Sequence, residues 1–498
     1  MTGAERRRET VDLSWLLAGL VEAPRVAVQD LTLDSRGVHA GDAFVAIAGR
    51  TTHGLDHVAE AVARGAVAVL WDPAEGYALP SLPPSVAAVA VPGLRPELGD
   101  VADRFYGEPS VALEVAGITG TNGKTSCAWL FAQCFGADGA YLGTLGAGRP
   151  PAVTPSTHTT PDVVAVHRSL RAMLDAGARW VAMEVSSHAL DQGRVDGVRL
   201  PVAGFTNLTR DHLDYHGTMA AYGAAKERLF AARGVEHAVI NVDDEFGRAL
   251  AARLPAPVEL TAVARVAERG DWSRFVHASR VERQPDGLEL EIDTHLGPCR
   301  LRSALIGDFN ADNLLVVLGL LLAAGEPLER ASERLSRASA PPGRMEAFAM
   351  APGGPTLVVD YAHTPDALGK VLAALRAHTR GRLWCVFGCG GDRDPGKRPL
   401  MAAAAEAIAD RIVLTDDNPR TEDPDRIVAM LRGALRGRVP AQVERDRAKA
   451  IAGAIAEARA GDVVLVAGKG HEDYQIYGTE RRHFSDREVA LSLMGRAA

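Results

Sequence analysis

Residues 114–126 read EVAGITGTNGKTS, and this stretch decides the fold. A short apolar run leads into a glycine turn that ends in Gly123-Lys124-Thr125, and an apolar segment follows as far as Phe135. A strand, a glycine turn and a helix in this order form a phosphate-binding loop. Glycines let backbone N–H groups approach phosphate oxygens, and the helix N-terminus adds partial positive charge. We therefore expect a nucleotide-binding strand, loop and helix here.

The glycine turn departs from the general phosphate-loop pattern at one position. The pattern G-x-x-x-x-G-K-[ST] places a glycine where this chain has Ile118. Lys124 adds a full positive charge, and the hydroxyl of Thr125 can bind a magnesium ion. A glycine turn that merely precedes Lys-Thr is the alternative, but the flanking strand and helix favour ATP.

Composition restricts the classes of protein to which the chain can belong. Its 498 residues leave room for roughly three domains. The 55 basic and 63 acidic residues give a net charge of −8, so no basic surface is expected for nucleic acid. Five cysteines without paired C-x-x-C spacing indicate buried thiols in a reducing cytoplasm. The most apolar run, residues 314–325, is too short to cross a bilayer and predicts a core helix.

Apolar stretches and turns predict three α/β domains. Residues 1–110 are typical of a small N-terminal α/β domain, and residues 111–338 of a central, doubly wound P-loop ATPase domain. Residues 339–498 alternate strand and helix again, as in a Rossmann-like domain with an open parallel sheet. Strands are expected at 43–48, 66–71, 86–91, 179–188, 202–208, 237–245, 356–363, 382–388, 411–416 and 462–468, and a hairpin at 271–305.

Several polar residues of the central domain invite two interpretations. Glu184 ends an apolar strand, where an acid is unfavourable unless it is paired or bound to a cation, so a magnesium role is plausible. The loop 209–217 holds Asp211, His212, Asp214 and His216. These four residues form either a metal-binding cluster or an ordinary set of charged loop residues. Lys226 lies on an expected helix, where a solvated lysine is the plain interpretation. Asn310 and Asn313 are N-cap candidates for the helix expected from Leu314.

Polar loops also follow the expected strands of the two outer domains. In the N-terminal domain Asp34-Ser35-Arg36 follows a strand, and a turn that closes the strand is favoured over a binding site. In the C-terminal domain four loops follow parallel strands, so they should converge on one site. Arg393 and Arg420 can bind a carboxylate there, and Asp417 and Glu472 an ammonium, which suits an amino acid.

The motifs in their order resemble the Mur peptide ligases over practically the whole chain. The motifs are TGTNGKT, EVSSH, NLTRDHLDYHG, AAK ending at Lys226, GDFNADN, GRME, DYAHTPDAL, GGDRD, DDNPR and GKGHEDYQ. The resemblance implies a cytoplasmic, monomeric enzyme of peptidoglycan precursor synthesis that uses ATP and Mg²⁺, with small-molecule substrates and no membrane. ATP would convert the D-Glu γ-carboxylate of UDP-MurNAc-L-Ala-D-Glu into an acyl phosphate. The amine of 2,6-diaminopimelate would then attack it.

The resemblance also implies a role for residues at matching positions. The catalytic residues would be Lys124, Lys226 as N6-carboxylysine, and His212. The ATP site would comprise Gly120, Thr121, Asn122, Gly123, Lys124, Thr125, Ser126, Asn310, Asn313, Arg344 and Asp360. Magnesium would be held by Thr125, Glu184, His212 and Lys226. The UDP-MurNAc-dipeptide site would comprise Leu33, Ser35, Arg50, Thr51, Thr52, Thr159, Thr160, Ser186, Gln192 and Arg194. The diaminopimelate site would comprise Arg393, Asp417, Asn418, Pro419, Arg420, Gly468 and Glu472.

Some alternatives stay open at the level of the sequence. Arg420 can pair with the distal carboxylate of diaminopimelate, which lysine lacks, so a lysine-adding relative is the second choice. A folylpolyglutamate synthase-like ligase or a P-loop switch protein is a further alternative. His158 stands where the family has asparagine, which leaves its role open, and the same charges would serve meso- and LL-diaminopimelate.

Overall fold

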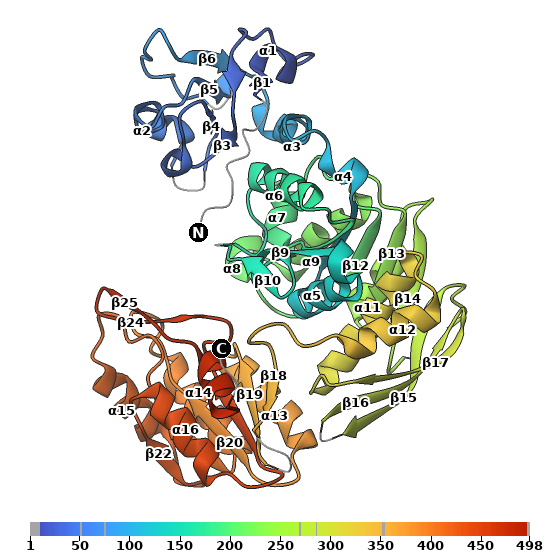
Figure 1. The fold of residues 1–498 in the computed structure, drawn as a ribbon, viewed down its shortest axis with the longest axis vertical. Helices are drawn as coiled ribbons and strands as arrows, with labels where there is room; N and C mark the ends of the chain where they lie inside the picture. Colours follow the sequence, from blue (N-terminus) through green and yellow to red (C-terminus); the bar gives the residue numbers. More distant parts are fainter. Residues whose placement is uncertain are drawn as a thin grey trace. The chain divides into compact units, whose positions relative to one another are not determined.

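The computed structural model describes residues 10–49, 52–73, 76–156, 158–267, 270–284, 286–350 and 354–495 (Figure 1). The chain forms two compact units. The first comprises Met1–Lys124, Phe135–Ala238 and Ala252–Glu259, and the second comprises Thr125–Cys134, Val239–Ala251 and Leu260–Ala498. The domain bounds 1–110, 111–338 and 339–498 remain predictions.

The first unit begins with a four-stranded parallel sheet in the order β3-β4-β5-β6. All four residues of β4 are buried, as expected for a strand covered on both faces. The strands predicted at 43–48, 66–71 and 86–91 are confirmed. The elements here are β1 (Val11–Asp12), α1 (Leu13–Leu16), β2 (Ala27–Val28), β3 (Leu31–Thr32), β4 (Ala43–Ala46), α2 (Val58–Ala63), β5 (Ala68–Trp71), β6 (Ala87–Ala90), α3 (Leu94–Phe105) and α4 (Pro109–Ala112).

A second group of paired strands in the first unit carries the glycine turn. Strand β7 (Glu114–Thr119) pairs in parallel with β11 (Trp180–Glu184) on one side and β12 (Val202–Phe205) on the other. Helix α5 (Lys124–Cys134) follows β7 directly, so the predicted strand, loop and helix are confirmed. The further elements are β8 (Gly139–Gly143), β9 (Gly146–Arg149), β10 (Ala152–Thr154), α6 (Val163–Asp175), α7 (Ser187–Asp191), α8 (Leu213–His216) and α9 (Met219–Glu227).

The middle of the chain adds strands and an apolar helix to the second unit. Strands β15 (Phe275–Gln284) and β16 (Gly287–Thr294) form the predicted antiparallel hairpin, and β17 (Gly297–Ser303) pairs with β16. Helix α11 spans Asp308–Ala323 and is almost entirely buried, so the run at 314–325 is a core helix as predicted. The helix starts at Asp308 and not at Leu314. No helix within the described ranges is long and apolar enough to cross a membrane. The remaining elements here are β13 (His237–Asn241), α10 (Glu245–Ala251), β14 (Glu259–Ala264) and α12 (Leu328–Arg337).

The last part of the second unit is a six-stranded sheet in the order β18-β19-β23-β20-β21-β22. Its strands are parallel except for the antiparallel edge strand β18, and separate apolar clusters form around the sheet. The predicted open parallel sheet is confirmed. Its elements are β18 (Glu346–Ala349), β19 (Thr356–Asp360), α13 (Pro365–His378), β20 (Leu383–Phe387), α14 (Lys397–Ile408), β21 (Arg411–Leu414), α15 (Pro424–Ala434), β22 (Ala441–Val443), α16 (Arg447–Glu457), β23 (Val463–Ala467), β24 (Tyr474–Tyr477), β25 (Glu480–His483) and α17 (Asp486–Leu493).

A fully buried ion pair joins two helices of this part. Arg447 begins α16 and Asp486 begins α17, and both side chains are inaccessible to solvent. Arg447 Nε donates to Asp486 Oδ1 at 2.7 Å and Nη2 donates to Oδ2 at 2.8 Å. Removing one partner of a buried ion pair leaves the other charge buried and unpaired, which is strongly unfavourable. A single substitution in this pair should therefore lower the free energy of unfolding.

We expect Asp486→Ala to lower the free energy of unfolding by about 3–5 kcal/mol, because Arg447 is left buried and unpaired. Denaturant titration followed by circular dichroism measures the change. Asp366→Ala is the matched control, since its pair with Lys370 is exposed and should contribute little. Equal midpoints for the two variants would contradict the role given to the buried pair.

Candidate active site

The glycine turn after β7 has a shape that only glycine allows. Gly120 has φ +148°, and a Cβ there would lie 1.9 Å from Thr206 Oγ1. The segment after β12 holds the turn from the other side. The N–H of Thr121 donates to Asn207 O at 2.8 Å, and Thr206 Oγ1 donates to Asn122 O at 2.6 Å. The first turn of α5, with Lys124 and Thr125, therefore follows a loop of defined geometry.

Two lysines donate to the same carbonyl oxygen in this turn. Lys124 Nζ donates to Gly120 O at 2.8 Å, and Lys226 Nζ donates to it at 2.7 Å. Lys226 is only 1% exposed, so the plain interpretation of a solvated lysine is wrong. Burial, and then the charge of Lys124, lowers the pKa of Lys226 to about 6. The amine is then mostly neutral at pH 7 and able to react with CO₂, which suits the predicted carbamate.

Glu184 lies at the end of β11 and is 1% exposed. Its carboxylate accepts hydrogen bonds from the Tyr141 hydroxyl and, at 2.9 Å, from the N–H of Thr144. The Thr144 hydroxyl lies 3.2 Å from the second carboxylate oxygen. These partners offset the unfavourable burial of the acid without a metal. The burial of Glu184 is therefore not by itself a sign of magnesium.

The predicted magnesium ligands differ from an ordinary acidic cluster. Throughout the described part of the chain, no three His, Cys, Asp or Glu side chains gather as a metal site. The predicted set includes Thr125 and Lys226, and an ammonium would repel a cation. The set suits magnesium once Lys226 carries a carbamate, because that group is an anion with oxygen ligands.

His212 belongs to a cluster of aromatic rings beside the glycine turn. It has φ +51°, and its ring centroid lies 4.8 Å from that of His188 and 5.9 Å from that of Tyr222. The Tyr222 hydroxyl lies 3.1 Å from Thr121 Oγ1, and Lys226 Nζ lies 4.5 Å from the Tyr222 ring centre. Burial, and then the charge of His212, lowers the pKa of His188 to about 4, so His188 is neutral at pH 7.

The residues assigned to the dipeptide are joined by hydrogen bonds. Arg194 Nη1 donates to Thr160 O at 2.8 Å, and Arg194 Nε donates to Gln192 Oε1 at 3.0 Å. Thr160 Oγ1 lies 3.5 Å from Ser186 Oγ. Sequence reasoning missed Tyr215, whose hydroxyl accepts from Gln192 Nε2 at 3.0 Å. Tyr215 was part of a quoted motif, but nothing in the sequence indicated this contact.

Two other residues lie close to this group. Thr159 Oγ1 lies 3.1 Å from the Thr144 hydroxyl, which itself lies beside Glu184. His158 is exposed, and its carbonyl accepts from Ser156 Oγ at 3.0 Å.

The N-terminal residues assigned to the uridine end surround a turn. The N–H of Arg36 donates to Asp34 Oδ1 at 3.0 Å, so Asp34 caps the short helix η1 (Ser35–Gly37). The predicted turn after the strand is confirmed. Ser35 is buried and donates to Glu60 Oε2 at 2.6 Å. Leu33 is partly buried against the core, and Thr52 is exposed. Arg50 and Thr51 lie outside the described residues.

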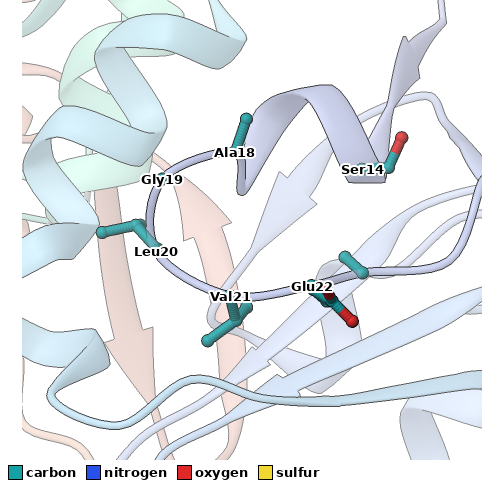
Figure 2. A pocket seen from close by; sticks show the side chains of 7 residues that line it. Ser14, Ala18, Gly19, Leu20, Val21 and Glu22 are labelled. Atoms are coloured by element: carbon teal, nitrogen blue, oxygen red, sulfur yellow. The ribbon is translucent and has the colours of Figure 1, made fainter.

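A cavity of about 620 Å³ lies elsewhere in this N-terminal part, beside α1 (Figure 2). Ser14 and Glu22 are its only polar lining side chains among the described residues. None of its lining residues is a predicted site residue, and the lining offers little for recognition of a charged substrate. The lining residues are Ser14, Ala18, Gly19, Leu20, Val21, Glu22 and Ala23.

The residues assigned to adenine lie inside a helix and not at its cap. Asn310 and Asn313 face the same side of α11, and Asn313 Nδ2 donates to Asn310 Oδ1 at 2.9 Å. Asn310 Nδ2 donates to Ile306 O at 2.8 Å. The N-cap prediction is wrong because α11 begins earlier, with Gly307 as its N-cap. Both asparagines are buried.

Asp360 ends β19 and Arg344 lies just before β18, and the antiparallel pairing of these two strands brings them close together. Asp360 Oδ2 accepts from Met345 N at 2.9 Å, and Oδ1 accepts from Ala362 N at 2.8 Å. Burial raises the pKa of Asp360, and the nearby Arg344 charge acts in the opposite direction. The Arg344 guanidinium lies 4.6 Å from the centre of the Tyr361 ring.

The four C-terminal loops meet, as predicted. The N–H of Gly391 donates to Asn418 O at 2.9 Å, and Arg420 Nη1 donates to Gly391 O at 2.8 Å. The N–H of Gly468 donates to Asp360 O at 3.1 Å. The first two contacts join the loop after β20 to the loop after β21. The third joins the loop after β23 to the end of β19.

The residues of these loops differ in exposure and backbone conformation. Arg420 has φ +54°, a left-handed conformation that is uncommon for a non-glycine residue, and its N–H donates to Ile476 O at 2.9 Å. Arg393 is exposed, Pro419 is buried and Gly468 has φ +119°.

Asp417, Asn418 and Glu472 surround a lysine that sequence reasoning missed. Lys469 is fully buried, and its Nζ lies 3.4, 3.3 and 3.4 Å from their respective side-chain oxygens. Lys469 stood in the quoted motif GKGHEDYQ. Two of its three partners, Asp417 and Asn418, lie about fifty positions away, which the motif alone does not reveal.

Three family models match the chain: the Mur ligase family, catalytic domain, at residues 27–106, the Mur ligase middle domain at 118–321, and the Mur ligase, glutamate ligase domain at 343–470. A relative from Xanthomonas campestris pv. campestris (strain 8004), a UDP-N-acetylmuramoyl-L-alanyl-D-glutamate–2,6-diaminopimelate ligase, is 51% identical over 97% of each chain. A relative of the same name from Xylella fastidiosa (strain Temecula1) is 50% identical over 98% of each chain.

Solved structures agree with this relationship. The structure of a ligase with that same name is 34% identical and superimposes with a TM-score of 0.71, covering 98% of this chain and 99% of the other. Folylpolyglutamate synthase of Mycobacterium tuberculosis is 19% identical with a TM-score of 0.58, covering 80% and 95%, and shares the fold alone. The chain belongs to the Mur ligase family. It is a ligase with the predicted three-domain α/β architecture.

We expect Lys226 to take up ¹³CO₂ as a carbamate, because burial lowers its pKa to about 6 and a neutral amine is the reactive form. ¹³C NMR in labelled bicarbonate should show a carbamate resonance at pH 8. The resonance should weaken as the pH falls through about 6, where the amine becomes protonated.

Lys226→Met should abolish the resonance, and Lys449→Met, at an exposed lysine, should retain it. A carbamate signal that persists in Lys226→Met would contradict the assignment.

Proposed function

We propose that this chain is an ATP-dependent amide ligase of peptidoglycan precursor synthesis. It adds 2,6-diaminopimelate to the D-Glu γ-carboxylate of UDP-MurNAc-L-Ala-D-Glu and releases ADP and phosphate. The observation that carries the proposal is the charge pattern of the C-terminal loops. Asp417 and Glu472 each lie 3.4 Å from Lys469 Nζ, and Arg420 Nη1 donates to Gly391 O at 2.8 Å, so both signs of charge gather where these loops meet. Such a place suits a zwitterion, and relatives at about 50% identity bear the name of this reaction.

The chemistry requires an activated carboxylate, because a free carboxylate is a poor electrophile. A γ-carboxylate oxygen attacks the γ-phosphorus of ATP, the bond to ADP breaks, and an acyl phosphate forms. The amine nitrogen of diaminopimelate then attacks the acyl carbon and loses a proton, and the C–O bond to phosphate breaks. Lys124 and the N–H groups of the glycine turn stabilise the charge on the transferred phosphoryl group.

We assign the nucleotide to the residues that the family resemblance indicates. Gly120 to Ser126 hold the phosphates, Asn310 and Asn313 lie at the adenine, and Arg344 and Asp360 at the phosphate and ribose. Thr125, Glu184, His212 and the carbamate of Lys226 would hold Mg²⁺, which supplies positive charge beside the phosphates when it is bound. The support from this chain is the neutral, buried Lys226 beside the glycine turn.

The three domains have separate substrates in this proposal. Residues 1–110 bind the uridine end of the UDP-linked substrate, residues 111–338 bind ATP, and residues 339–498 bind the amino acid. The hydrogen-bonded group around Arg194 supports a site for the dipeptide portion, since it joins Thr160, Gln192 and Ser186. A reaction that consumes ATP and a uridine nucleotide belongs in the cytoplasm, and we propose a monomer.

The preference for diaminopimelate over L-lysine rests on Arg420. The distal end of diaminopimelate carries a carboxylate beside its ammonium, whereas that of lysine carries the ammonium alone. Arg420 is held at the loops by Ile476 O and Gly391 O, and its guanidinium can pair with that carboxylate. A lysine-adding ligase is the second candidate, because Asp417 and Glu472 suit either ammonium.

Phosphate release by the purified enzyme tests the function directly. We expect release that depends on both UDP-MurNAc-L-Ala-D-Glu and diaminopimelate, with a product of the tripeptide mass. Meso-diaminopimelate, LL-diaminopimelate and L-lysine should be compared side by side. Release that is insensitive to both substrates, as in a P-loop switch protein, would overturn the proposal, and turnover with L-lysine alone would support the second candidate.

We expect Arg420→Ala to raise the KM for diaminopimelate at least about 30-fold, since truncating one side of a buried charge pair costs 2 kcal/mol or more. The KM for ATP should stay within about twofold of the wild-type value, because within the described part of the chain the hydrogen bonds of Arg420 lie in the amino-acid loops. Arg432→Ala is the matched control, because Arg432 is an exposed arginine on the neighbouring helix α15. A parallel loss of ATP affinity would contradict the role given to Arg420.

A further inference from the structure

Lys469 is an unusual lysine, because its side chain is completely inaccessible to solvent. Lysines are almost never fully buried unless they are paired. Its ammonium has three N–H donors, and three side-chain oxygens surround it: Asp417 Oδ1 at 3.4 Å, Asn418 Oδ1 at 3.3 Å and Glu472 Oε2 at 3.4 Å. All three neighbours belong to the residues assigned to the amino-acid substrate.

The distances show that the ammonium is shared. Each is longer than the usual 2.7–3.2 Å of an N–H···O bond, so Lys469 is centred among three acceptors and not locked onto one. Other bonds orient two of these acceptors. Asn418 Nδ2 donates to Glu472 Oε2 at 3.2 Å, and Ile476 N donates to Asn418 Oδ1 at 3.1 Å. The two carboxylates therefore keep capacity for a second cation.

The loops that carry these groups are tied together beneath the site. Arg447 donates to Asp416 O at 3.3 Å and to Ala467 O at 3.0 Å, so one guanidinium joins the ends of β21 and β23. Gln475 Nε2 donates to Asp417 O at 3.1 Å. The position of Lys469 relative to Asp417 is thus set by the fold.

We propose that Lys469 is a positioning residue that sets the charge and the spacing of the amino-acid site. Its ammonium holds Asp417, Asn418 and Glu472 in one arrangement and cancels one of the two negative charges. This inference rests on the proposed function, since it concerns the same site.

Charge balance then makes Lys469 a determinant of specificity. Apart from the exposed Arg393, the charged groups of the site are Asp417, Glu472, Lys469 and Arg420. These four together have no net charge, which matches the neutral, zwitterionic distal end of diaminopimelate. Without Lys469 the four positions would carry one negative charge. That balance favours the cationic distal end of L-lysine over the zwitterion.

Lys469→Met tests this inference, because methionine is of similar length and has no charge. We expect the KM for diaminopimelate to rise at least tenfold, and the ratio of kcat/KM for diaminopimelate to that for L-lysine to fall at least tenfold. The KM for ATP should stay within twofold. Lys449→Met is the matched control, since it removes an exposed lysine from α16, and it should change none of these values.

A double-substitution cycle separates charge balance from mere packing. Glu472→Gln removes one negative charge, so in combination with Lys469→Met it restores the balance. If the two substitutions acted independently, their fold-losses in kcat/KM for diaminopimelate would multiply. We expect the fold-loss of the double variant to be at least threefold smaller than that product. Multiplicative losses, or an unchanged ratio of the two amino acids in Lys469→Met, would overturn the inference.

Two further measurements keep the test decisive. If Lys469→Met does not fold, Asp417→Asn is used, which leaves the lysine in place and gives the site one positive charge. It should weaken L-lysine more than diaminopimelate, and equal losses would overturn the inference. Wild-type enzyme that fails to use diaminopimelate would refute the proposed function, whereas wild-type turnover with an unchanged ratio in the variants refutes only the role of Lys469.

Discussion

The carbonyl oxygen of Gly120 accepts hydrogen bonds from two lysines, and the chemistry that we propose for the central site depends on this contact. Burial disfavours the charged form of Lys226, and the charge of Lys124 at the same oxygen adds to this effect. The proton is therefore lost most easily from Lys226, whose pKa falls to about 6. The contact requires a backbone that turns sharply at Gly120, where any side chain would collide with Thr206. A local requirement for glycine thus leads to an unusual lysine more than a hundred residues away.

The same geometric rule places the polar residues in both units. In the first unit β7 and β11 are parallel, so the glycine turn and Glu184 lie at the same edge of one sheet. In the second unit β19, β23, β20 and β21 are parallel, and the loops after them exchange hydrogen bonds. Parallel strands bring their carboxyl ends together, which explains how a site can form from segments far apart in the chain. These loops can carry charged side chains, which would be unfavourable inside the buried strands of the sheet.

Local sequence pattern predicts features that are contiguous in the chain and misses those that depend on tertiary contacts. The strands were predicted well, because each is an apolar run bounded by turn residues, and the phosphate loop was predicted because its glycines and Lys-Thr are contiguous. The start of α11 was placed too late, because the polar residues 308–313 read as a cap although they form the first turns of the helix. The plain interpretation of Lys226 as a solvated lysine is wrong, whereas the resemblance implies a carbamylated one, and the local pattern gives no sign that Lys469 is buried. Both lysines are buried by contacts with other strands and loops, which local pattern does not record.

The sequence by itself determined the α/β class, the order of strands and helices, the phosphate loop and the family resemblance. These features depend on periodicity and on motifs whose residues are adjacent in the chain. Only the tertiary structure decided which charges are buried and which partners they have. It paired Glu184 with Tyr141 and Thr144, Arg447 with Asp486, and Lys469 with Asp417 and Glu472. The physical reason is that the free energy of a charge depends on solvent exclusion and on neighbours brought close by folding, and most of these neighbours lie far away in sequence.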